Sequence, residues 1–221
     1  MQADAILFVS GAAVTHFFAD ALAPVDAAMR TRFWAPGPGT ARLLKKAIAP
    51  WGWGAERIDS PPLEAAQFDS EHLWPVVSSQ VEQGRLVLIV RGTSGREPPV
   101  QGVPGVAGHG RDWLIQQCLA AGAQVQGCVA YARRSPPLST QDQGLLAVAC
   151  GPDSAWLFSS SEALIPLQAQ RPAAGWGHTT AIVTHPRIAA AARLAGFDRI
   201  VSTRPALDDV MRTLESGWTR P

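Results

Sequence analysis

Several short stretches of the sequence place small hydroxyl residues and arginines where an apolar run gives way to a helical pattern. The first turn of a helix at such a point offers unpaired backbone N–H groups and the positive end of the helix dipole, and both attract anions. Arginine adds a planar fork of donors that fits carboxylates and phosphates. This chemistry predicts the binding of a ligand with several negative charges. The residues at these positions are Ser10, Thr40, Arg91, Thr93, Ser94, Arg111, Ser159, Ser160, Ser161, Thr184, His185 and Arg187.

The hydroxyl residues of this set have a second explanation as helix caps. Ser159 and Glu162 have the spacing of a capping box. Pro38 and Pro186 stand where a first-turn proline loses no hydrogen bond. Capping does not explain the arginines, and these therefore carry the prediction of an anion site: Arg91, Arg111 and Arg187.

Other chemistries lack their motifs. The stretch GTSGR (92–96) has an arginine where a nucleophile elbow needs its last glycine, and GHGRDW has Trp113 where a dinucleotide fingerprint needs its third glycine. The sequence contains no P-loop, no HExxH motif and no Cys/His set with zinc spacing. We therefore predict an anion-binding site without a nucleophile, a metal ion or a nucleotide-binding loop.

The composition is that of a globular chain with material for a large core. Of 221 residues, 47% are hydrophobic and 17% charged, and 19 basic residues against 18 acidic ones give a net charge of +1, which argues against a broad nucleic-acid-binding face. No apolar run approaches the roughly 20 residues of a membrane span, and the start MQADAILFVSG lacks the basic residues of a signal peptide. Three cysteines without CxxC spacing suggest reduced thiols in the cytoplasm.

The pattern of the chain predicts an α/β fold with a mostly parallel sheet, because short apolar runs alternate with helical segments. Ligands of such sheets bind beyond the carboxyl ends of the strands. The predicted strands are 5–9, 85–90, 124–131, 155–158 and 180–184, and the predicted helices are 11–22, 40–49, 70–83, 111–121, 161–169, 187–195 and 206–215.

Two pairs of segments suggest an internal duplication. DAILFVSGAAVTHFF resembles SAWLFSSSEALIPL, which sets Ser10 against Ser159, an offset of 149, and GPGTARLL resembles HPRIAAAA at an offset of 148. At this offset the counterpart of the strand that ends near Arg91 would precede Met1. We therefore expect the first copy to lack its opening strand and helix.

Several segments, in order along nearly the whole chain, resemble those of the uroporphyrinogen-III synthase family. They are DAILFVSGAAV, GPGTARLL, FDSEHLW, VLIVRGTSGR, GRDWLIQQCLAAGAQVQGCVAYARRSP, LFSSSEAL and THPRIAAAARLAGF. The resemblance implies two flavodoxin-like parallel-sheet domains, 1–134 and 135–221, joined by a two-strand connector, with the substrate in the cleft between them. It implies a monomer that uses no cofactor. The family's opening segment of roughly 50 residues is not found, and the second domain would then lack an inner strand.

The resemblance also implies the reaction and its residues. The family cyclises hydroxymethylbilane, a linear tetrapyrrole, to uroporphyrinogen III, with loss of water, a spiro intermediate and inversion of ring D. Tyr131, the only tyrosine, matches the family's general acid, although a tyrosine at this strand end could instead be a packing residue. The implied substrate-binding residues are Ser10, Thr40, Ser70, Arg91, Gly92, Arg111, Ser159, Ser160, His185 and Arg187.

The sequence departs from the family pattern in two further places. Ile188 and Ala189 stand where the family often has Thr-Ala, so that Arg187 or His185 would replace the hydroxyl. Residues 93–109 form a Gly/Pro-rich insertion, for which we expect a mobile loop. The alternative to the enzyme is an inactive, truncated homologue that binds tetrapyrrole-like polyanions or a partner protein, and a small-molecule sensor is a third possibility.

Overall fold

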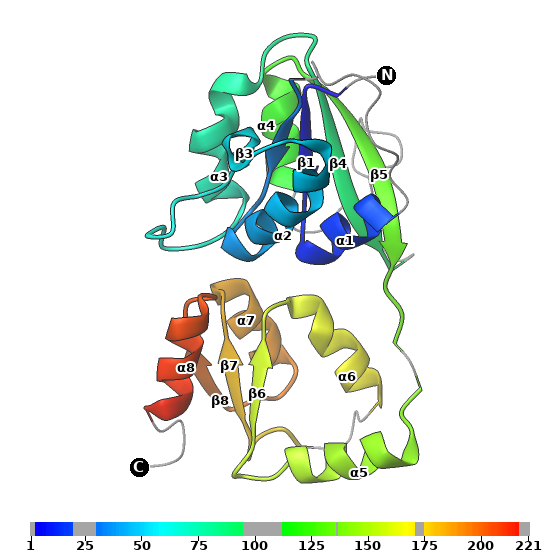
Figure 1. The fold of residues 1–221 in the computed structure, drawn as a ribbon. Coiled ribbons are helices and arrows are strands. Elements are labelled where there is room, and N and C mark those ends of the chain that lie inside the picture. The colour runs from blue at the N-terminus through cyan, green and yellow to red at the C-terminus, as the bar shows by residue number, and fades with distance from the viewer. Residues whose placement is uncertain (1–2, 20–29, 95–111, 136, 171–174, 217–221) are drawn as a thin grey trace. The chain divides into compact units, whose positions relative to one another are not determined.

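The computed structural model describes residues 3–19, 30–94, 112–135, 137–170 and 175–216. The chain forms two compact units, residues 1–134 and 135–221. Each unit has its own parallel sheet and its own hydrophobic core (Figure 1).

The first unit contains five parallel strands in the order β3-β2-β1-β4-β5. The order reverses between β1 and β4, and such a switch point is where open α/β sheets bind ligands. Without the two-residue β3, the remaining order is the flavodoxin-like one. The strands are β1 (Ala5–Phe8), β2 (Arg32–Trp34), β3 (Ile58–Asp59), β4 (Leu86–Thr93) and β5 (Gln124–Ala132).

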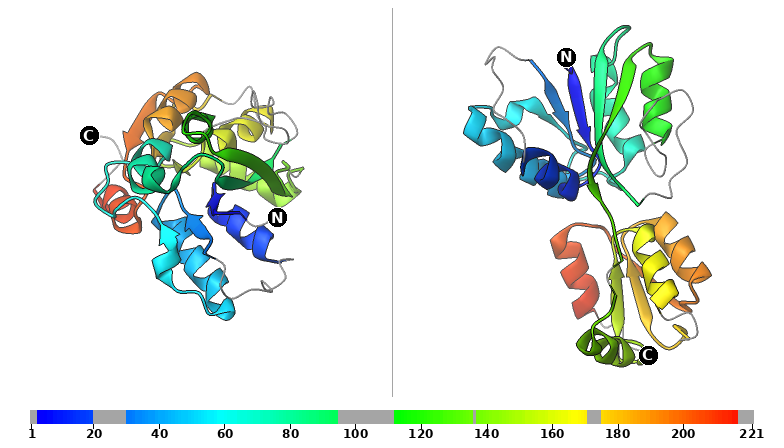
Figure 2. Two further views of the ribbon diagram at one scale, coloured as in Figure 1. Left: turned by 90° about the horizontal axis from the view of Figure 1, so that it is seen from above. Right: turned by 90° about the vertical axis from the view of Figure 1, so that its right-hand side faces the viewer.

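Helices cover both faces of this sheet, which is why β1 and residues 86–90 of β4 are apolar. The helices are α1 (Gly11–Ala19), α2 (Pro38–Ile48), α3 (Ser70–Val77) and α4 (Asp112–Ala120). Phe8, Phe33 and Val90 pack with α1 and α2, whereas Leu7 and Ile89 pack with α3 and α4 (Figure 2). Parallel strands with helices on both faces confirm the predicted fold class.

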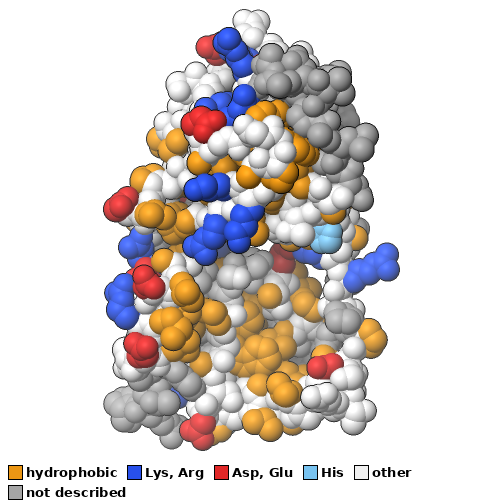
Figure 3. Space-filling view, viewed as in Figure 1, with side chains coloured by type: hydrophobic (Ala, Val, Ile, Leu, Met, Phe, Trp, Pro, Cys, Tyr) orange, Lys and Arg blue, Asp and Glu red, His pale blue; other side chains and the backbone are white. Residues whose placement is uncertain are grey.

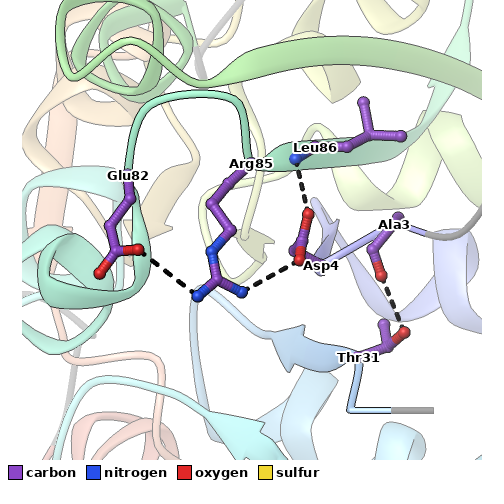
Figure 4. A network of polar contacts seen from close by, with 6 residues as sticks. All are labelled: Ala3, Asp4, Thr31, Glu82, Arg85 and Leu86. Carbon is purple, nitrogen blue, oxygen red and sulfur yellow. Dashed lines mark hydrogen bonds and ion pairs between the residues drawn. The ribbon is translucent and has the colours of Figure 1, made fainter.

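A polar network fastens the amino ends of β1, β2 and β4 (Figure 4). Asp4 Oδ2 accepts a hydrogen bond from the Leu86 N–H at 2.9 Å, and Arg85 Nη1 donates to Asp4 Oδ1 at 3.0 Å. Thr31 Oγ1 donates to the Ala3 carbonyl at 2.8 Å. The Leu86 N–H and, more weakly, Arg85 lower the pKa of Asp4.

Asp4→Ala is expected to lower the free energy of unfolding by about 1 kcal/mol at pH 7, because the charged acceptor of Leu86 is lost. Since the pKa of Asp4 is lowered on folding, its contribution is present above the unfolded-state pKa and is lost as the pH falls below about 4. Urea denaturation at pH 7 and pH 3 should therefore show a larger difference between variant and parent at the higher pH. An equal difference at both values would exclude the charge as its source.

The second unit contains three parallel strands in the order β6-β7-β8. The core packs Phe158, Trp176 and Phe197 against α6 and α7, and the rings of Trp176 and Phe197 stack with their centroids 5.2 Å apart. The elements are α5 (Thr140–Ala149), β6 (Ala155–Phe158), α6 (Leu164–Gln170), β7 (Thr180–Val183), α7 (Pro186–Leu194), β8 (Arg199–Ser202) and α8 (Leu207–Glu215).

Several large apolar side chains of the second unit are exposed, and Figure 3 shows hydrophobic side chains gathered on one face of it. Leu157 belongs to this group because its strand, β6, lies at the edge of the sheet. The others include Leu145, Val148, Ile165, Leu207, Met211 and Leu214.

Four elements are not predicted by the sequence pattern: β2, β3, α5 and β8. The strands have two to four residues, which is too short for a clear periodicity, and α5 buries no side chain, so it has no apolar face to reveal it. The predicted helix 70–83 ends at Val77 and continues as a 3-10 turn over Ser78–Gln80. Residues 133–135 and 137–139, which lead to α5, belong to no strand, so the described residues contain no two-strand connector.

All three cysteines are free thiols, as expected. Burial raises the pKa of the Cys118 thiol to about 12, so it carries no useful thiolate at neutral pH. In the described part of the chain, none of the helices has the length and apolar character needed to cross a lipid bilayer.

Candidate active site

The carboxyl edge of the five-stranded sheet brings four of the predicted site residues together: Ser10, Arg91, Gly92 and Tyr131. Ser10 follows β1, Arg91 and Gly92 lie near the end of β4, and Tyr131 lies near the end of β5. The Ser10 Oγ and the Tyr131 hydroxyl oxygen are 3.2 Å apart and share a hydrogen bond. Residues 121 positions apart in the chain therefore meet at the switch point of the sheet.

A β-bulge directs the Tyr131 side chain toward Ser10. Arg91 pairs with Val129, but the next residue, Gly92, pairs with Tyr131, so Ala130 is an extra residue in β5. Both Ala130 and Tyr131 then pack on the face covered by α1 and α2. Without the extra residue, Tyr131 would share the opposite face with Val129, because successive side chains of a strand alternate.

Gly92 provides the space for the Tyr131 ring. A Cβ atom at residue 92 would lie 2.3 Å from Tyr131 Cζ and 2.4 Å from Cε2, closer than any real contact. The sequence predicts Gly92 as a substrate-binding residue. Its geometry gives it a different task, which is to let the aromatic ring lie against the backbone of β4.

Ser10 and Thr40 lie at the starts of α1 and α2. The Ser10 Oγ accepts a hydrogen bond from the Ala13 N–H at 3.3 Å, so it caps α1 as well as meeting Tyr131. Thr40, which is 9% exposed, lies in the first turn of α2. That helix begins at Pro38 after Gly37, which provides no side-chain cap. The first turn of α2 therefore keeps backbone donors for an anion.

Arg91 is a buried cation without a counter-charge among the described residues. Its side chain is 6% exposed, and its one hydrogen bond in the described part of the chain runs from Nε to the Gly92 carbonyl at 3.4 Å. No carboxylate of the described residues pairs with it. Because a buried charge is costly unless paired, this guanidinium favours an anionic ligand at the carboxyl edge of the sheet. Arg91 pairs with Val129, so its side chain lies on the face of the sheet opposite to Tyr131.

Two residues that the sequence analysis does not single out surround the Tyr131 ring. The His16 imidazole of α1 stacks on it, with centroids 5.2 Å apart and planes at 21°. Arg133 Cζ lies 5.9 Å from its centroid, and Arg133 Nη2 donates to the Gly92 carbonyl at 3.2 Å. Arg133 follows Tyr131 by two residues and could have been found from the strand alternation, but the position of His16 depends on helix packing.

Another predicted residue, Ser70, does not join this cluster. Ser70 is 1% exposed in the first turn of α3, where the cap is Asp69, whose Oδ1 accepts from the His72 N–H at 3.0 Å. Ser70 thus lies in the interior. Arg111 and most of the 93–109 insertion are outside the described residues.

The second unit places its predicted residues at the carboxyl edge of its own sheet. Ser159 and Ser160 follow β6 and are exposed. The Ser160 Oγ accepts from the Glu162 N–H at 3.3 Å, so Ser160 is the cap, and the predicted capping role of Ser159 is wrong by one residue. The 3-10 turn begins at Ser161, so the capping position is that of the preceding residue, Ser160.

The stretch Thr-His-Pro-Arg connects β7 to α7 in this unit. Thr184 Oγ1 donates to the Phe158 carbonyl at 3.4 Å, and His185 caps the helix, with Nδ1 accepting from the Arg187 N–H at 3.1 Å. Pro186 occupies the first turn, as predicted, and the Arg187 side chain is exposed. This edge therefore presents an arginine and a capped helix start.

The residues of neither edge form a metal site: among the described residues, no three His, Cys, Asp or Glu side chains cluster in that way. A cavity of about 580 Å³ lies instead at the amino ends of β1, β2 and β4. Its charged lining includes Asp4, Arg85 and Glu82, which pair with one another. The unpaired Arg91 and the Tyr131–Ser10 pair make the carboxyl edge the better candidate.

Comparison with known proteins shows the family and the fold of the chain. Residues 1–212 match the model of a family described as uroporphyrinogen-III synthase HemD. Among solved structures, a uroporphyrinogen-III synthetase from Helicobacter pylori aligns with 96% of this chain and 83% of its own, at 15% identity and a TM-score of 0.57. A mutant uroporphyrinogen III synthase from Thermus thermophilus aligns with 97% and 78%, at 14% identity and a TM-score of 0.51. At these identities the structural likeness concerns the fold. No curated protein matches the chain.

Proposed function

Because the chain belongs to the uroporphyrinogen-III synthase family, we propose that it cyclises hydroxymethylbilane at the carboxyl edge that holds Tyr131. The family's reaction is that of a lyase in porphyrin and heme biosynthesis: the substrate loses water and closes to uroporphyrinogen III with ring D inverted. The observation that carries the assignment of the site is the Tyr131–Ser10 hydrogen bond at the carboxyl edge of the sheet. The same edge contains the buried Arg91, which pairs with no carboxylate of the described residues.

The binding of the substrate rests on charge. Hydroxymethylbilane is rich in carboxylates, and Arg91 provides one of them with a forked, desolvated partner. The first turns of α1 and α2, which contain Ser10 and Thr40, add backbone and hydroxyl donors. The second unit contributes its own donors, Ser159, Ser160, His185 and Arg187. We include Arg111, which lies outside the described residues, in the same proposal.

In the chemical step, Tyr131 acts as the general acid. The C–O bond of the hydroxymethyl group breaks as the Tyr131 O–H gives its proton to the leaving hydroxyl, which departs as water. The pyrrole N–H of the resulting cation then loses its proton, which restores the Tyr131 hydroxyl and leaves a neutral azafulvene. The azafulvene is attacked by the substrate's own pyrrole, and the resulting spiro intermediate opens and recloses with ring D inverted. The substrate cyclises unaided to the wrong isomer, so the larger task of the enzyme is to hold the chain in the productive conformation.

Tyr131→Phe is expected to lower kcat about fivefold with little change in KM, since the ring remains and only the proton donor is lost. The far-UV circular dichroism and melting temperature should match the parent. A variant that turns over at the full rate would return Tyr131 to the packing role that its strand-end position also allows.

A coupled assay with hydroxymethylbilane tests the function itself. Supplied with this substrate, the protein should produce the type III isomer, which chromatography separates from the type I isomer formed without enzyme. Binding of the substrate with only the type I product would favour the alternative, an inactive homologue that binds tetrapyrrole-like polyanions.

The state of the protein in the cell belongs to the same proposal. We propose a cytoplasmic monomer that takes a small-molecule substrate and uses neither cofactor nor nucleic acid. Light scattering at micromolar concentration measures the oligomeric state, and full activity after exhaustive dialysis against a chelator tests the independence from metal.

A further inference from the structure

We infer that His16 is a positioning residue, which holds the Tyr131 ring so that its hydroxyl stays on Ser10. The inference rests on the proposed role of Tyr131 as the proton donor. It adds a residue outside the set that the sequence predicts, and it assigns a task to a side chain on the solvent side of α1.

The Tyr131 ring has a neighbour on each side that could limit its motion. Gly92 lets it lie against β4, Arg133 approaches the ring at 5.9 Å, and the hydroxyl is tied to Ser10 at 3.2 Å. The His16 imidazole stacks on the ring with centroids 5.2 Å apart. Stacked aromatic pairs have a preferred geometry that packing alone does not impose.

The contacts of Tyr131 with Ser10 and with His16 both come from α1 and its capping residue. Ser10 caps α1, and His16 lies within the same helix, which spans Gly11–Ala19. The position and tilt of the phenol are thereby tied to a single element. A shift of the ring away from His16 would also change the Tyr131–Ser10 distance, since His16 and Ser10 belong to the same helix and its cap.

The packing of α1 indicates that His16 is not needed for the stability of the fold. The helix is anchored in the core by Ala13 and Val14, which are fully buried, and by the partly buried Phe17 and Phe18. His16 is exposed and belongs to none of the core clusters. Its removal is therefore expected to release the ring and leave the fold intact.

The test uses the fact that the protein has a single tyrosine. Labelling with 3-fluorotyrosine gives one 19F resonance, which reports only on residue 131. In His16→Ala we expect this resonance to shift and narrow toward that of a freely rotating ring. In His16→Phe, which keeps a flat ring in the same place, it should stay near the parent position. Thr15→Ala, at an exposed neighbour on the same helix, is the matched control.

Kinetics provide the second readout. His16→Ala should lower kcat about fivefold, the value of one aromatic stack, with KM within twofold of the parent, and His16→Phe should restore most of the rate. An unshifted resonance in His16→Ala overturns the inference. A raised KM at unchanged kcat in His16→Ala also overturns it, because His16 would then be a substrate ligand. A His16→Phe variant as slow as His16→Ala overturns it as well, because the imidazole nitrogens, and not the flat ring, would then be what the reaction needs.

The two readouts keep this inference apart from the proposed function. The 19F resonance needs no turnover, so a protein without synthase activity would still show the release of the ring in His16→Ala and support the positioning role. Full activity of Tyr131→Phe, in contrast, would contradict the proton-donor role and leave the 19F result unchanged.

Discussion

Arg91→Met is expected to raise the KM for hydroxymethylbilane about 30-fold while the free energy of unfolding stays the same or rises. The guanidinium is 6% exposed and has no carboxylate partner among the described residues, so the folded protein without substrate carries an uncompensated cation. Methionine keeps the length of the side chain and removes that charge, which is neutral or favourable for folding. A charged hydrogen bond to a substrate carboxylate contributes roughly 2 kcal/mol, which corresponds to the stated loss of affinity.

Arg32→Met is the matched control for this experiment. Arg32 lies at the start of β2, away from the carboxyl edge, and its Nε and Nη2 donate to the carboxylate of Asp59. Its replacement should lower the free energy of unfolding by about 1 kcal/mol and leave KM unchanged. Steady-state kinetics and urea denaturation of both variants decide the matter. If Arg91→Met destabilises the protein and binds substrate normally, the guanidinium is a structural group.

Gly92→Ala is expected to lower kcat at least tenfold, more than the loss of the Tyr131 hydroxyl does. The added methyl group would lie 2.3 Å from Tyr131 Cζ and 2.8 Å from Cε1, so the ring must leave its place and carry the hydroxyl away from Ser10. Overpacking of this kind destabilises a fold by about 1–3 kcal/mol, which calorimetry should detect.

A double-mutant cycle isolates the contact between the two residues. In a Tyr131→Ala background the ring is absent, so Gly92→Ala should have almost no further effect on kcat. Gly144→Ala is the control: a Cβ there meets no atom within 4 Å, so the change should stabilise α5 by about 0.5–1 kcal/mol and leave kcat unaltered. Additive effects of Gly92→Ala and Tyr131→Ala would mean that Gly92 acts on the substrate directly.

Much of the architecture is encoded locally in the sequence. Apolar runs such as 5–9 and 180–184 predict buried strands because a strand covered on both faces has no polar side, and β1 and β7 confirm them to within one residue. Pro38 and Pro186 mark the starts of α2 and α7, since a first-turn proline sacrifices no hydrogen bond. Strand ends, helix starts and their charged residues thus follow from short-range rules.

Which residues reach the candidate site can also be predicted from the sequence. Ser10, Arg91, Gly92 and Tyr131 all stand at the ends of strands, and parallel strands necessarily bring their carboxyl ends to one edge. The second unit obeys the same rule with Ser159, Ser160, His185 and Arg187, whose joint role in binding stays a prediction.

The details that give these residues their tasks depend on contacts between distant segments. The extra residue in β5 that turns Tyr131 toward Ser10 exists only in the pairing with β4, and no local pattern marks it. The close approach that requires Gly92, the stack of His16 and the isolation of Arg91 are likewise products of packing. A sequence pattern records which side chains reach an edge, because that depends on neighbours along the chain. Their distances, burial and partners are set by residues distant in the chain, up to 121 positions apart for Ser10 and Tyr131. Only the folded chain brings such residues near one another.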